Sequence, residues 1–232
     1  IDWINYHQGN KEQGEYRGIP NTGQFHPGYT GGTSTTADPL GKPLTRATIV
    51  SKRNGWEATW EFFSTHARLT MKTVKGKYWL LYEGTPGGVV EKADTWWRSD
   101  GTKSTCWDKW NDTDITNSSG AASGTEWVAF ADATVDRSLF LIHAPDDTNK
   151  DDYWQMGGTK GMTVFGFGRN GWMNLSTAGD TLTIGFVESR SFKAIKAHVH
   201  KVHTGTVTPP ADAGGAADAA ATSDGAGPGA DV

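Results

Sequence analysis

Ten short runs typical of β-strands occur between residues 46 and 203, and in several of them hydrophobic and polar residues alternate. Alternation with a period of two is typical of a β-strand that buries one face. These runs are rich in β-branched and aromatic residues and are separated by Gly, Asn, Asp or Pro. We predict ten strands: Thr48–Lys52, Trp56–Phe63, Ala67–Val74, Tyr78–Glu83, Glu126–Ala131, Ser138–His143, Tyr153–Met156, Met162–Phe167, Thr181–Glu188 and Phe192–His203. No segment of ten or more residues has a convincing helical period.

Ten short strands without helices predict an all-β fold, either a sandwich or a barrel. We expect residues 1–205 to form an antiparallel β-sandwich of jelly-roll or concanavalin-like type, or a truncated part of a larger sandwich. Residues 1–45 are rich in Gly, Pro, Asn and Thr. Such a long irregular opening is usually functional or covers another element. Alternatively, these residues are the remnant of a truncated domain.

The segment 56–83 predicts a three-stranded meander with a defined register. A two-residue turn at Ser64-Thr65 places polar pairs on one face and apolar pairs on the other, as cross-strand pairing prefers: Glu61–Arg68, Thr59–Thr70, Glu57–Lys72, Trp60–Leu69 and Ala58–Met71. A second turn at Lys75-Gly76 adds the pairs Met71–Leu80, Leu69–Tyr82 and Arg68–Glu83. Trp79 and Leu81 then share the charged face, which makes it neither a clean core face nor a clean solvent face.

The composition supports a folded domain, although the hydrophobic content is only 36%. Thirty glycines account for part of this deficit, and eleven tryptophans offset it, because each indole can bury a large area. The single cysteine, Cys106, excludes an intrachain disulfide and leaves secretion open. No run of 18 apolar residues occurs, so we expect no transmembrane helix.

The net charge of −4 lies entirely near the C-terminus. Residues 209–232 contain four acids, Asp212, Asp218, Asp224 and Asp231, and no Lys or Arg. Removing these four from the 26 acids leaves 22, which equals the 22 Lys and Arg residues. A neutral domain is a poor candidate for nucleic-acid binding, because that binding relies on positive charge.

Residues 206–232 are rich in Ala, Gly, Asp and Pro and contain no aromatic residue. Such a segment cannot bury enough apolar surface to offset its ordering entropy, so we predict a disordered acidic tail or a linker to further modules. A linker of this kind suits an exported, modular protein. We therefore expect a secreted or cell-surface location. This location is inferred from the linker-like segment alone, since no signal peptide is visible in the sequence.

Several tryptophans lie in polar or loop-like surroundings, among them Trp79, Trp96 and Trp97. Sugar rings stack their C–H faces on indole rings, and sugar hydroxyls bind nearby charged or amide groups. A tryptophan-rich sheet face that also carries Glu, Asp and Arg therefore predicts a substrate-binding surface for a polysaccharide. The alternative interpretation assigns most of these indoles to the hydrophobic core.

The charged face of the meander holds candidate catalytic groups. Glu61 and Glu83 are two carboxylates that can act as acid and as nucleophile or base in glycoside hydrolysis. Arg68 between them favours their ionised forms, which suits a nucleophile better than a general acid. An ordinary ladder of charges on an exposed sheet face is the alternative.

The N-terminal segment offers Arg17, His26 and Tyr29. A lyase that acts on uronic acids needs these residue types, because Arg neutralises the carboxylate while Tyr or His moves the proton. We therefore count His26 as a candidate catalytic residue and Arg17 and Tyr29 as candidate substrate-binding residues. A structured loop with packed aromatic residues is the alternative.

Two segments contain candidate metal ligands. Asp147, Asn149 and Asp151 alternate as oxygen ligands do in calcium loops, although the EF-hand Gly and Glu are missing. A structural calcium ion is one interpretation, and a solvated acidic turn is the other. His198 and His200 share one face of the strand predicted there, which also suits a metal ion, whereas a polar strand end is the alternative.

These features favour an extracellular β-sandwich domain that binds a polysaccharide. An extension of this hypothesis is that the domain also cleaves the polysaccharide. The first alternative is a catalytic domain, a glycoside hydrolase or a polysaccharide lyase. The second alternative is a structural or adhesion module of a surface protein without catalysis.

Overall fold

The computed structural model describes residues 3–8, 33–36, 46–53, 55–63, 65–84, 90–113, 115, 124–156, 161–170 and 174–205. Within these ranges the chain forms the strands β1 (Trp3–Gln8), β2 (Thr33–Thr36), β3 (Arg46–Arg53), β4 (Trp56–Phe63), β5 (His66–Thr73), β6 (Tyr78–Gly84), β7 (Thr95–Arg98), β8 (Lys103–Thr105), β9 (Trp110–Thr113), β10 (Glu126–Ala131), β11 (Ser138–Ala144), β12 (Asp151–Met156), β13 (Met162–Phe167) and β14 (Thr181–Val187). They are followed by helix α1 (Phe192–Thr204).

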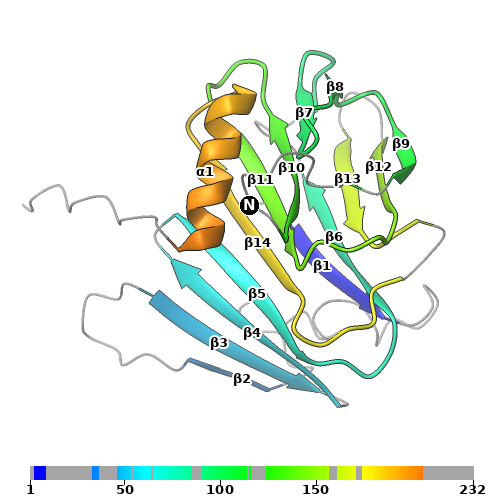
Figure 1. Ribbon diagram of the computed structural model, residues 1–232, viewed down its shortest axis with the longest axis vertical. Helices are drawn as coiled ribbons and strands as arrows, with labels where there is room; N and C mark the ends of the chain where they lie inside the picture. Colours follow the sequence, from blue (N-terminus) through cyan, green and yellow to red (C-terminus); the bar gives the residue numbers. More distant parts are fainter. Residues whose placement is uncertain are drawn as a thin grey trace, which may run out of the picture.

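The strands form two antiparallel sheets (Figure 1). The five-stranded sheet has the order β1-β6-β13-β12-β9, and the nine-stranded sheet has the order β2-β3-β4-β5-β14-β11-β10-β7-β8. The predicted antiparallel β-sandwich is thereby confirmed.

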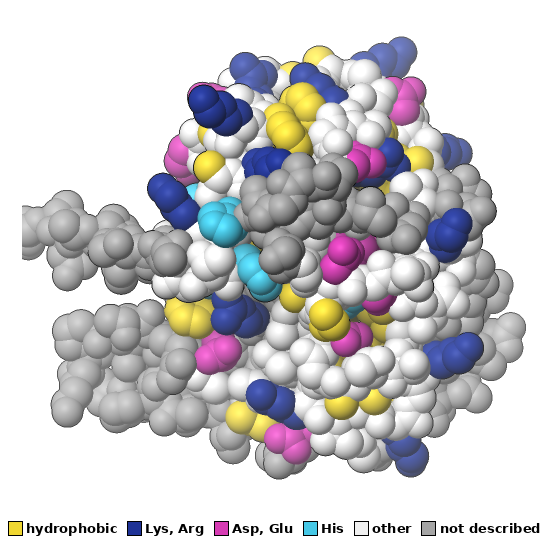
Figure 2. Space-filling view, viewed as in Figure 1, with side chains coloured by type: hydrophobic (Ala, Val, Ile, Leu, Met, Phe, Trp, Pro, Cys, Tyr) yellow, Lys and Arg dark blue, Asp and Glu magenta, His cyan; other side chains and the backbone are white. Residues whose placement is uncertain are grey.

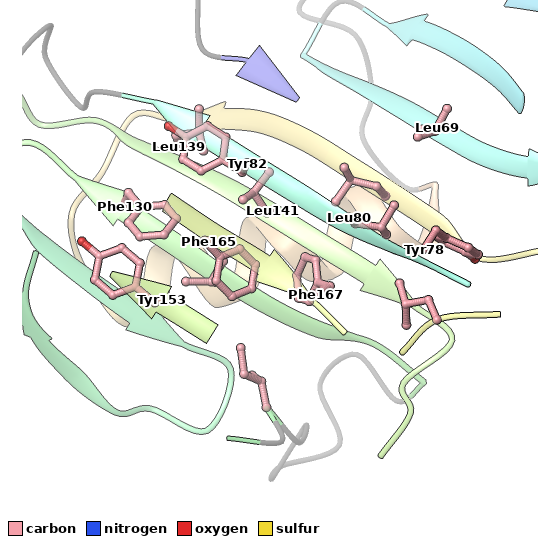
Figure 3. Close-up of a cluster of buried hydrophobic side chains, with 14 of the residues drawn as sticks. Leu69, Tyr78, Leu80, Tyr82, Phe130, Leu139, Leu141, Tyr153, Phe165 and Phe167 are labelled. Carbon is pink, nitrogen blue, oxygen red and sulfur yellow. The ribbon is translucent and has the colours of Figure 1, made fainter. Parts of the chain in front are cut away.

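The main hydrophobic core lies between the two sheets, because alternate side chains of strands such as β4, β6, β10 and β13 point inward. The ring of Phe130 is central to it, with centroids 5.5 Å from Tyr82, 5.4 Å from Tyr153 and 6.3 Å from Phe165. Figure 3 shows these rings pointing toward one another from strands of both sheets. Aromatic rings at such distances add to the stabilisation by area burial alone.

A second core covers the outer face of the nine-stranded sheet. Helix α1 packs there against β11 and β14 (Figure 1). Its buried residues Ile195, Val199 and Val202 join Trp127 and Phe140 in one cluster. All six residues of β10 are buried, because the other sheet covers one face of the strand and this second core covers the other.

The prediction of a strand at Phe192–His203 is wrong, because this segment is helix α1. The Ser191 hydroxyl accepts a hydrogen bond from the Ala194 N–H and caps the N-terminus, and Gly205 ends the helix in the left-handed conformation with φ 73°. Ile195, Val199 and Val202 recur at the spacing of one helix face. Four His and Lys residues lie between these apolar positions. In the sequence they give the alternation of polar and apolar residues that is typical of a strand.

The predicted meander is half correct. The β4–β5 hairpin has the predicted register, including Glu61 opposite Arg68, except that an irregularity places Glu57 opposite Thr73 instead of Lys72. The predicted pairing of β5 with β6 is wrong, because β5 pairs with β14 and β6 pairs with β1 and β13 of the other sheet.

The connection between β5 and β6 therefore crosses from one sheet to the other. The Met71 N–H donates to the Asp180 carbonyl at 2.9 Å, and the Met71 carbonyl accepts from the Gly179 N–H at 2.7 Å. Tyr78 exchanges backbone hydrogen bonds with Leu175. Backbone groups at the ends of β5 and β6 thus bind the segment before β14 instead of each other.

The structure also adds strands that the sequence did not predict. β1 and β2 lie in the segment expected to be loop, and the short strands β7, β8 and β9 lie between residues 95 and 113. The predicted disordered tail, residues 206–232, lies outside the described residues. The helix of the described part is neither long nor apolar enough to cross a membrane.

Candidate functional site

The outer face of the five-stranded sheet carries a mixed aromatic and charged surface. Trp79, Leu81 and Glu83 point outward from β6, since Tyr78, Leu80 and Tyr82 between them join the inner core. Register places Val164 of β13 opposite Glu83, and Trp154 of β12 opposite Val164. Trp79, Leu81 and Val164 are buried in one cluster, with the half-buried Trp154 packed against it.

Arg169 lies across this surface. Its guanidinium carbon is 3.9 Å from the ring centroid of Trp154 and 5.1 Å from that of Trp79, as in cation–π contacts. Gly168, with φ 65°, turns the chain directly after β13. The Arg169 stem then runs over Gly166, where an added Cβ would come within 2.8 Å of the Arg169 Cβ and Cδ. The absence of a side chain at Gly166 makes room for Arg169.

Charge and burial act against each other at Arg169. Partial burial lowers its pKa, and the carboxylates of Asp152 and Glu83 oppose that effect. The Arg169 Nη1 is buried and has no hydrogen-bond acceptor within the part of the chain that the structure describes. A buried unpaired donor is costly, more so on a charged group. We name the group formed by Trp79, Glu83, Asp152, Trp154 and Arg169 the arginine–tryptophan face.

Of the predicted catalytic residues, Glu83 lies on this face and Glu61 and Arg68 do not. Glu61 and Arg68 face outward from β4 and β5 of the nine-stranded sheet, so the two predicted carboxylates point away from each other on opposite sides of the sandwich. Arg68 instead donates from Nη2 to the Val202 carbonyl of α1 at 3.3 Å. The two predicted carboxylates therefore do not share a cleft.

The predicted substrate-binding tryptophans have different environments. Trp79 is 3% exposed and Trp96 is 4% exposed, so neither ring offers an open face to a sugar. Trp96 belongs to the core between the sheets, and its Nε1 donates to the Asp108 carbonyl at 3.1 Å. Trp97 is half-buried and packs on Phe192 of α1 at 5.2 Å between ring centroids. The candidates Arg17, His26 and Tyr29 lie outside the described residues.

A second polar group lies inside the sandwich, at one end of the core. Glu126 of β10 and His143 of β11 are opposite each other, and the Glu126 Oε1 is 2.5 Å from the His143 Nδ1. The His143 Nε2 faces the Asp180 Oδ2 at 3.9 Å, too long for a hydrogen bond. The Tyr78 hydroxyl donates to the same Asp180 oxygen at 2.5 Å. Asp147 completes what we name the buried acid–histidine cluster.

Burial and neighbouring charges shift the pKa values in this cluster. Burial raises the pKa of Glu126, against the opposing effect of His143. Burial disfavours the charged form of His143, but the carboxylates of Asp180 and Glu126 outweigh it and raise the pKa of His143. Burial, together with Asp180, raises the pKa of Tyr78. The pKa values of Glu126 and of His143 are therefore both raised.

The predicted calcium ligands form a turn with different partners. The Asp147 Oδ1 accepts from the Asn149 N–H at 2.6 Å, and its Oδ2 accepts from the Asn149 Nδ2 at 2.9 Å. Asn149 is thus a hydrogen-bond donor to Asp147. Asp151 is fully buried, and its Oδ1 accepts from the Gly168 N–H at 2.7 Å.

The histidines of α1 are not arranged as the predicted strand would place them. On a helix, His198 and His200 point to different sides, so they do not form the shared face expected for a strand. Figure 2 shows histidine side chains gathered near Lys or Arg side chains at the lower end of α1. Burial lowers the pKa of His198 and of His203.

Acid is expected to weaken the fold through His66. Burial, then the charges of Arg68 and His198, lower its pKa from about 6.5 to about 4. Its neighbours are the Thr65 hydroxyl, 3.0 Å from Nδ1, and the ring of Phe63 at 4.5 Å. The unfolded chain takes up this proton more readily than the folded chain, so the contribution is complete above pH 6.5 and is lost as pH falls toward 4.

Urea unfolding at pH 7.5 and at pH 5 measures this effect. The variant His66→Gln is expected to lose part of the stability difference between the two conditions. The variant His200→Gln, which changes an exposed histidine of α1, is the matched control and is expected to keep it. An equal pH dependence in His66→Gln and the unmodified chain would contradict the assignment.

Comparisons with protein-family models, with curated proteins and with solved structures found no match. The chemistry of the two sites is therefore the basis for assigning a function. The sequence interpretation missed Arg169, Glu126 and Asp180. Glu126 could have been found from the sequence. It is a charged residue at an inward-facing position of a strand whose other inward-facing residues, Val128 and Phe130, are apolar.

Proposed function

We propose that this chain is an exported domain that binds a polysaccharide on the arginine–tryptophan face of the five-stranded sheet. The observation that carries the proposal is Arg169, which contacts two indole rings and has a buried Nη1 without an acceptor among the described residues. Export belongs to the proposal because structural polysaccharides lie outside the cell.

The half-buried residues of the face supply the groups that a sugar needs. The guanidinium of Arg169 donates hydrogen bonds to sugar oxygens, and the carboxylates of Asp152 and Glu83 accept hydrogen bonds from sugar hydroxyls. Trp154 contributes an apolar ring at the same place, supported by the buried Trp79. Two carboxylates beside one guanidinium leave an excess of negative charge, which favours a neutral polysaccharide over a uronate polymer.

Glycoside hydrolysis is a second candidate function of the same face. Glu83 and Asp152 both act on the charge of Arg169, so two carboxylates lie near one group on this surface. Most glycosidases use two such carboxylates. Release of reducing ends from a polysaccharide that binds, and its loss in Glu83→Gln with binding retained, would support hydrolysis. Binding without any release would limit the function to recognition.

Affinity electrophoresis in gels that contain xylan, a mixed-linkage glucan or polygalacturonate tests the binding proposal. We expect retardation by a neutral polysaccharide and a loss of affinity of about tenfold or more in Arg169→Ala, since a hydrogen bond to a charged group contributes about 1.5–3 kcal/mol. The matched control is Arg137→Ala, an exposed arginine that lies 5.9 Å from the Phe186 ring and pairs with Glu188. It is expected to leave retardation unchanged.

A second variant moves Arg169 without removing it. In Gly166→Ala, the added Cβ comes within 2.8 Å of the Arg169 Cβ and Cδ, so Arg169 and the turn that carries it are expected to be displaced. Retardation should fall in this variant as well. If no neutral or acidic polysaccharide retards the unmodified chain, or if Arg169→Ala and Arg137→Ala behave alike, the proposal is wrong.

A further inference from the structure

The buried acid–histidine cluster has the composition of a metal site. Glu126, His143 and Asp147 each offer one ligand atom, and these atoms lie within 4.8 Å of one another. Zn–N and Zn–O bonds of about 2.0–2.2 Å in a tetrahedral site place ligand atoms about 3.3–3.6 Å apart, so side-chain shifts of about 1 Å would bring the three onto one ion. We propose that this cluster binds one divalent transition-metal ion, independently of the polysaccharide proposed for the other site.

Unpartnered buried atoms support the proposal. Among the described residues, the Glu126 Oε2, the His143 Nε2 and the Asp151 Oδ2 have no hydrogen-bond partner, and all three side chains are at most 1% exposed. A buried polar atom that nothing satisfies destabilises the fold. Two of these atoms, the Glu126 Oε2 and the Asp151 Oδ2, are carboxylate oxygens, and unpaired buried carboxylate oxygens indicate that a positively charged partner completes the site.

The charge of the cluster leads to the same conclusion. Carboxylates of Glu126, Asp147 and Asp151 influence one another, and Asp180 faces the one imidazole, that of His143. Buried carboxylates are normally paired with a cation or bound to a metal ion. Here several carboxylates face a single histidine.

The donor set favours a transition metal over the calcium ion expected from the sequence. Calcium takes six to eight oxygen ligands, whereas an imidazole nitrogen with carboxylate oxygens suits Zn²⁺ and its neighbours. Asp180, held by the Tyr78 hydroxyl, faces the Nε2 of His143 and can orient the ring as outer carboxylates do in zinc sites.

The ion would lie inside one end of the sandwich, held by the nine-stranded sheet and the connection that follows β11. Glu126 and His143 belong to the nine-stranded sheet, and Asp151 begins β12 of the five-stranded sheet. Asp147 lies in the connection between β11 and β12. Because all these side chains except Asp147 are buried, the ion would support the fold and would not contact a polymer.

Calorimetric titration of the chelator-treated full chain with Zn²⁺ tests the proposal. We expect one ion per chain and a higher melting temperature with Zn²⁺ than without it. The variant Asp147→Asn keeps an oxygen for the Asn149 N–H but removes the charge, and we expect it to weaken Zn²⁺ binding by about 10- to 100-fold. The control His200→Gln removes an exposed histidine of α1 that could bind Zn²⁺ on the surface.

A second measurement needs no variant. In histidine-selective NMR spectra, Zn²⁺ should shift the imidazole signals of the fully buried His143 at one equivalent. Absence of stoichiometric binding would overturn the proposal, as would Zn²⁺ binding that is lost in His200→Gln and kept in Asp147→Asn. Shifts confined to exposed histidines would also overturn it.

Discussion

Replacement of Phe130 by alanine is expected to lower the free energy of unfolding by about 3–5 kcal/mol. Phe130 is 1% exposed, and its ring lies against Tyr82 of the five-stranded sheet on one side and Tyr153 and Phe165 of the same sheet on the other. The substitution leaves a cavity between two sheets that cannot collapse onto it. Urea unfolding monitored by tryptophan fluorescence measures the loss.

The matched control is Phe186→Ala on β14. Phe186 has 53% of its surface exposed, although it belongs to the same nine-stranded sheet as Phe130. Loss of an exposed ring is expected to change stability by no more than about 0.5 kcal/mol. Equal losses in the two variants would show that Phe130 does not lie at the centre of the sandwich.

The strands that the sequence predicted best are those with strong local patterns. Glu126–Ala131 and Met162–Phe167 were predicted with the bounds they have in the structure, because β-branched and aromatic residues fill them and turn residues flank them. The short strands β7 and β8 have no such pattern: β7 pairs with β10, and β8 pairs with β7. The position of β7 depends on a neighbour that is distant in the sequence, which local propensity cannot supply.

The mixed face of the predicted meander was the sign that one pairing was wrong. Trp79 and Leu81 shared a face with Glu61 and Arg68 only while β6 was placed beside β5. In the structure the charged pair lies on the nine-stranded sheet and the indole lies on the five-stranded sheet. A strand with apolar residues on both faces, as in β6, fits a position in the middle of a sheet.

The candidate site was partly predictable. A face with Trp, Glu and Arg was expected at Trp79 and Glu83, and both residues lie on the arginine–tryptophan face. The arginine is Arg169 and not Arg68, since β13 and β12 reach β6 across a long sequence separation. No local pattern gives that neighbour. The polar residues at inward positions of β10 and β11 were visible in the sequence as exceptions to the alternation.

The second large loss of stability is expected from a charge placed on the side of α1 that faces the sheet. Val199 has no exposed surface and packs among Ile195, Val202 and Phe140 under the helix. In Val199→Asp a carboxylate enters this apolar cluster without a partner, and burying an unpaired charge is among the costliest substitutions known. We expect a loss of about 4 kcal/mol or more in the free energy of unfolding, or release of the helix from β11 and β14. Hydrogen exchange of the α1 amides distinguishes these two results.

The control Ala197→Asp makes the experiment a test of secondary structure as well. Residues two apart lie on the same face of a strand but on opposite sides of a helix. If Ala197–Val199 were a strand, as the alternation in the sequence suggested, both aspartates would enter the same environment and cost the same. In α1 residue 197 is exposed, so Ala197→Asp is expected to cost less than about 1 kcal/mol, mainly from helix propensity. A large difference between the two variants therefore requires the helix, and equal effects would require the strand.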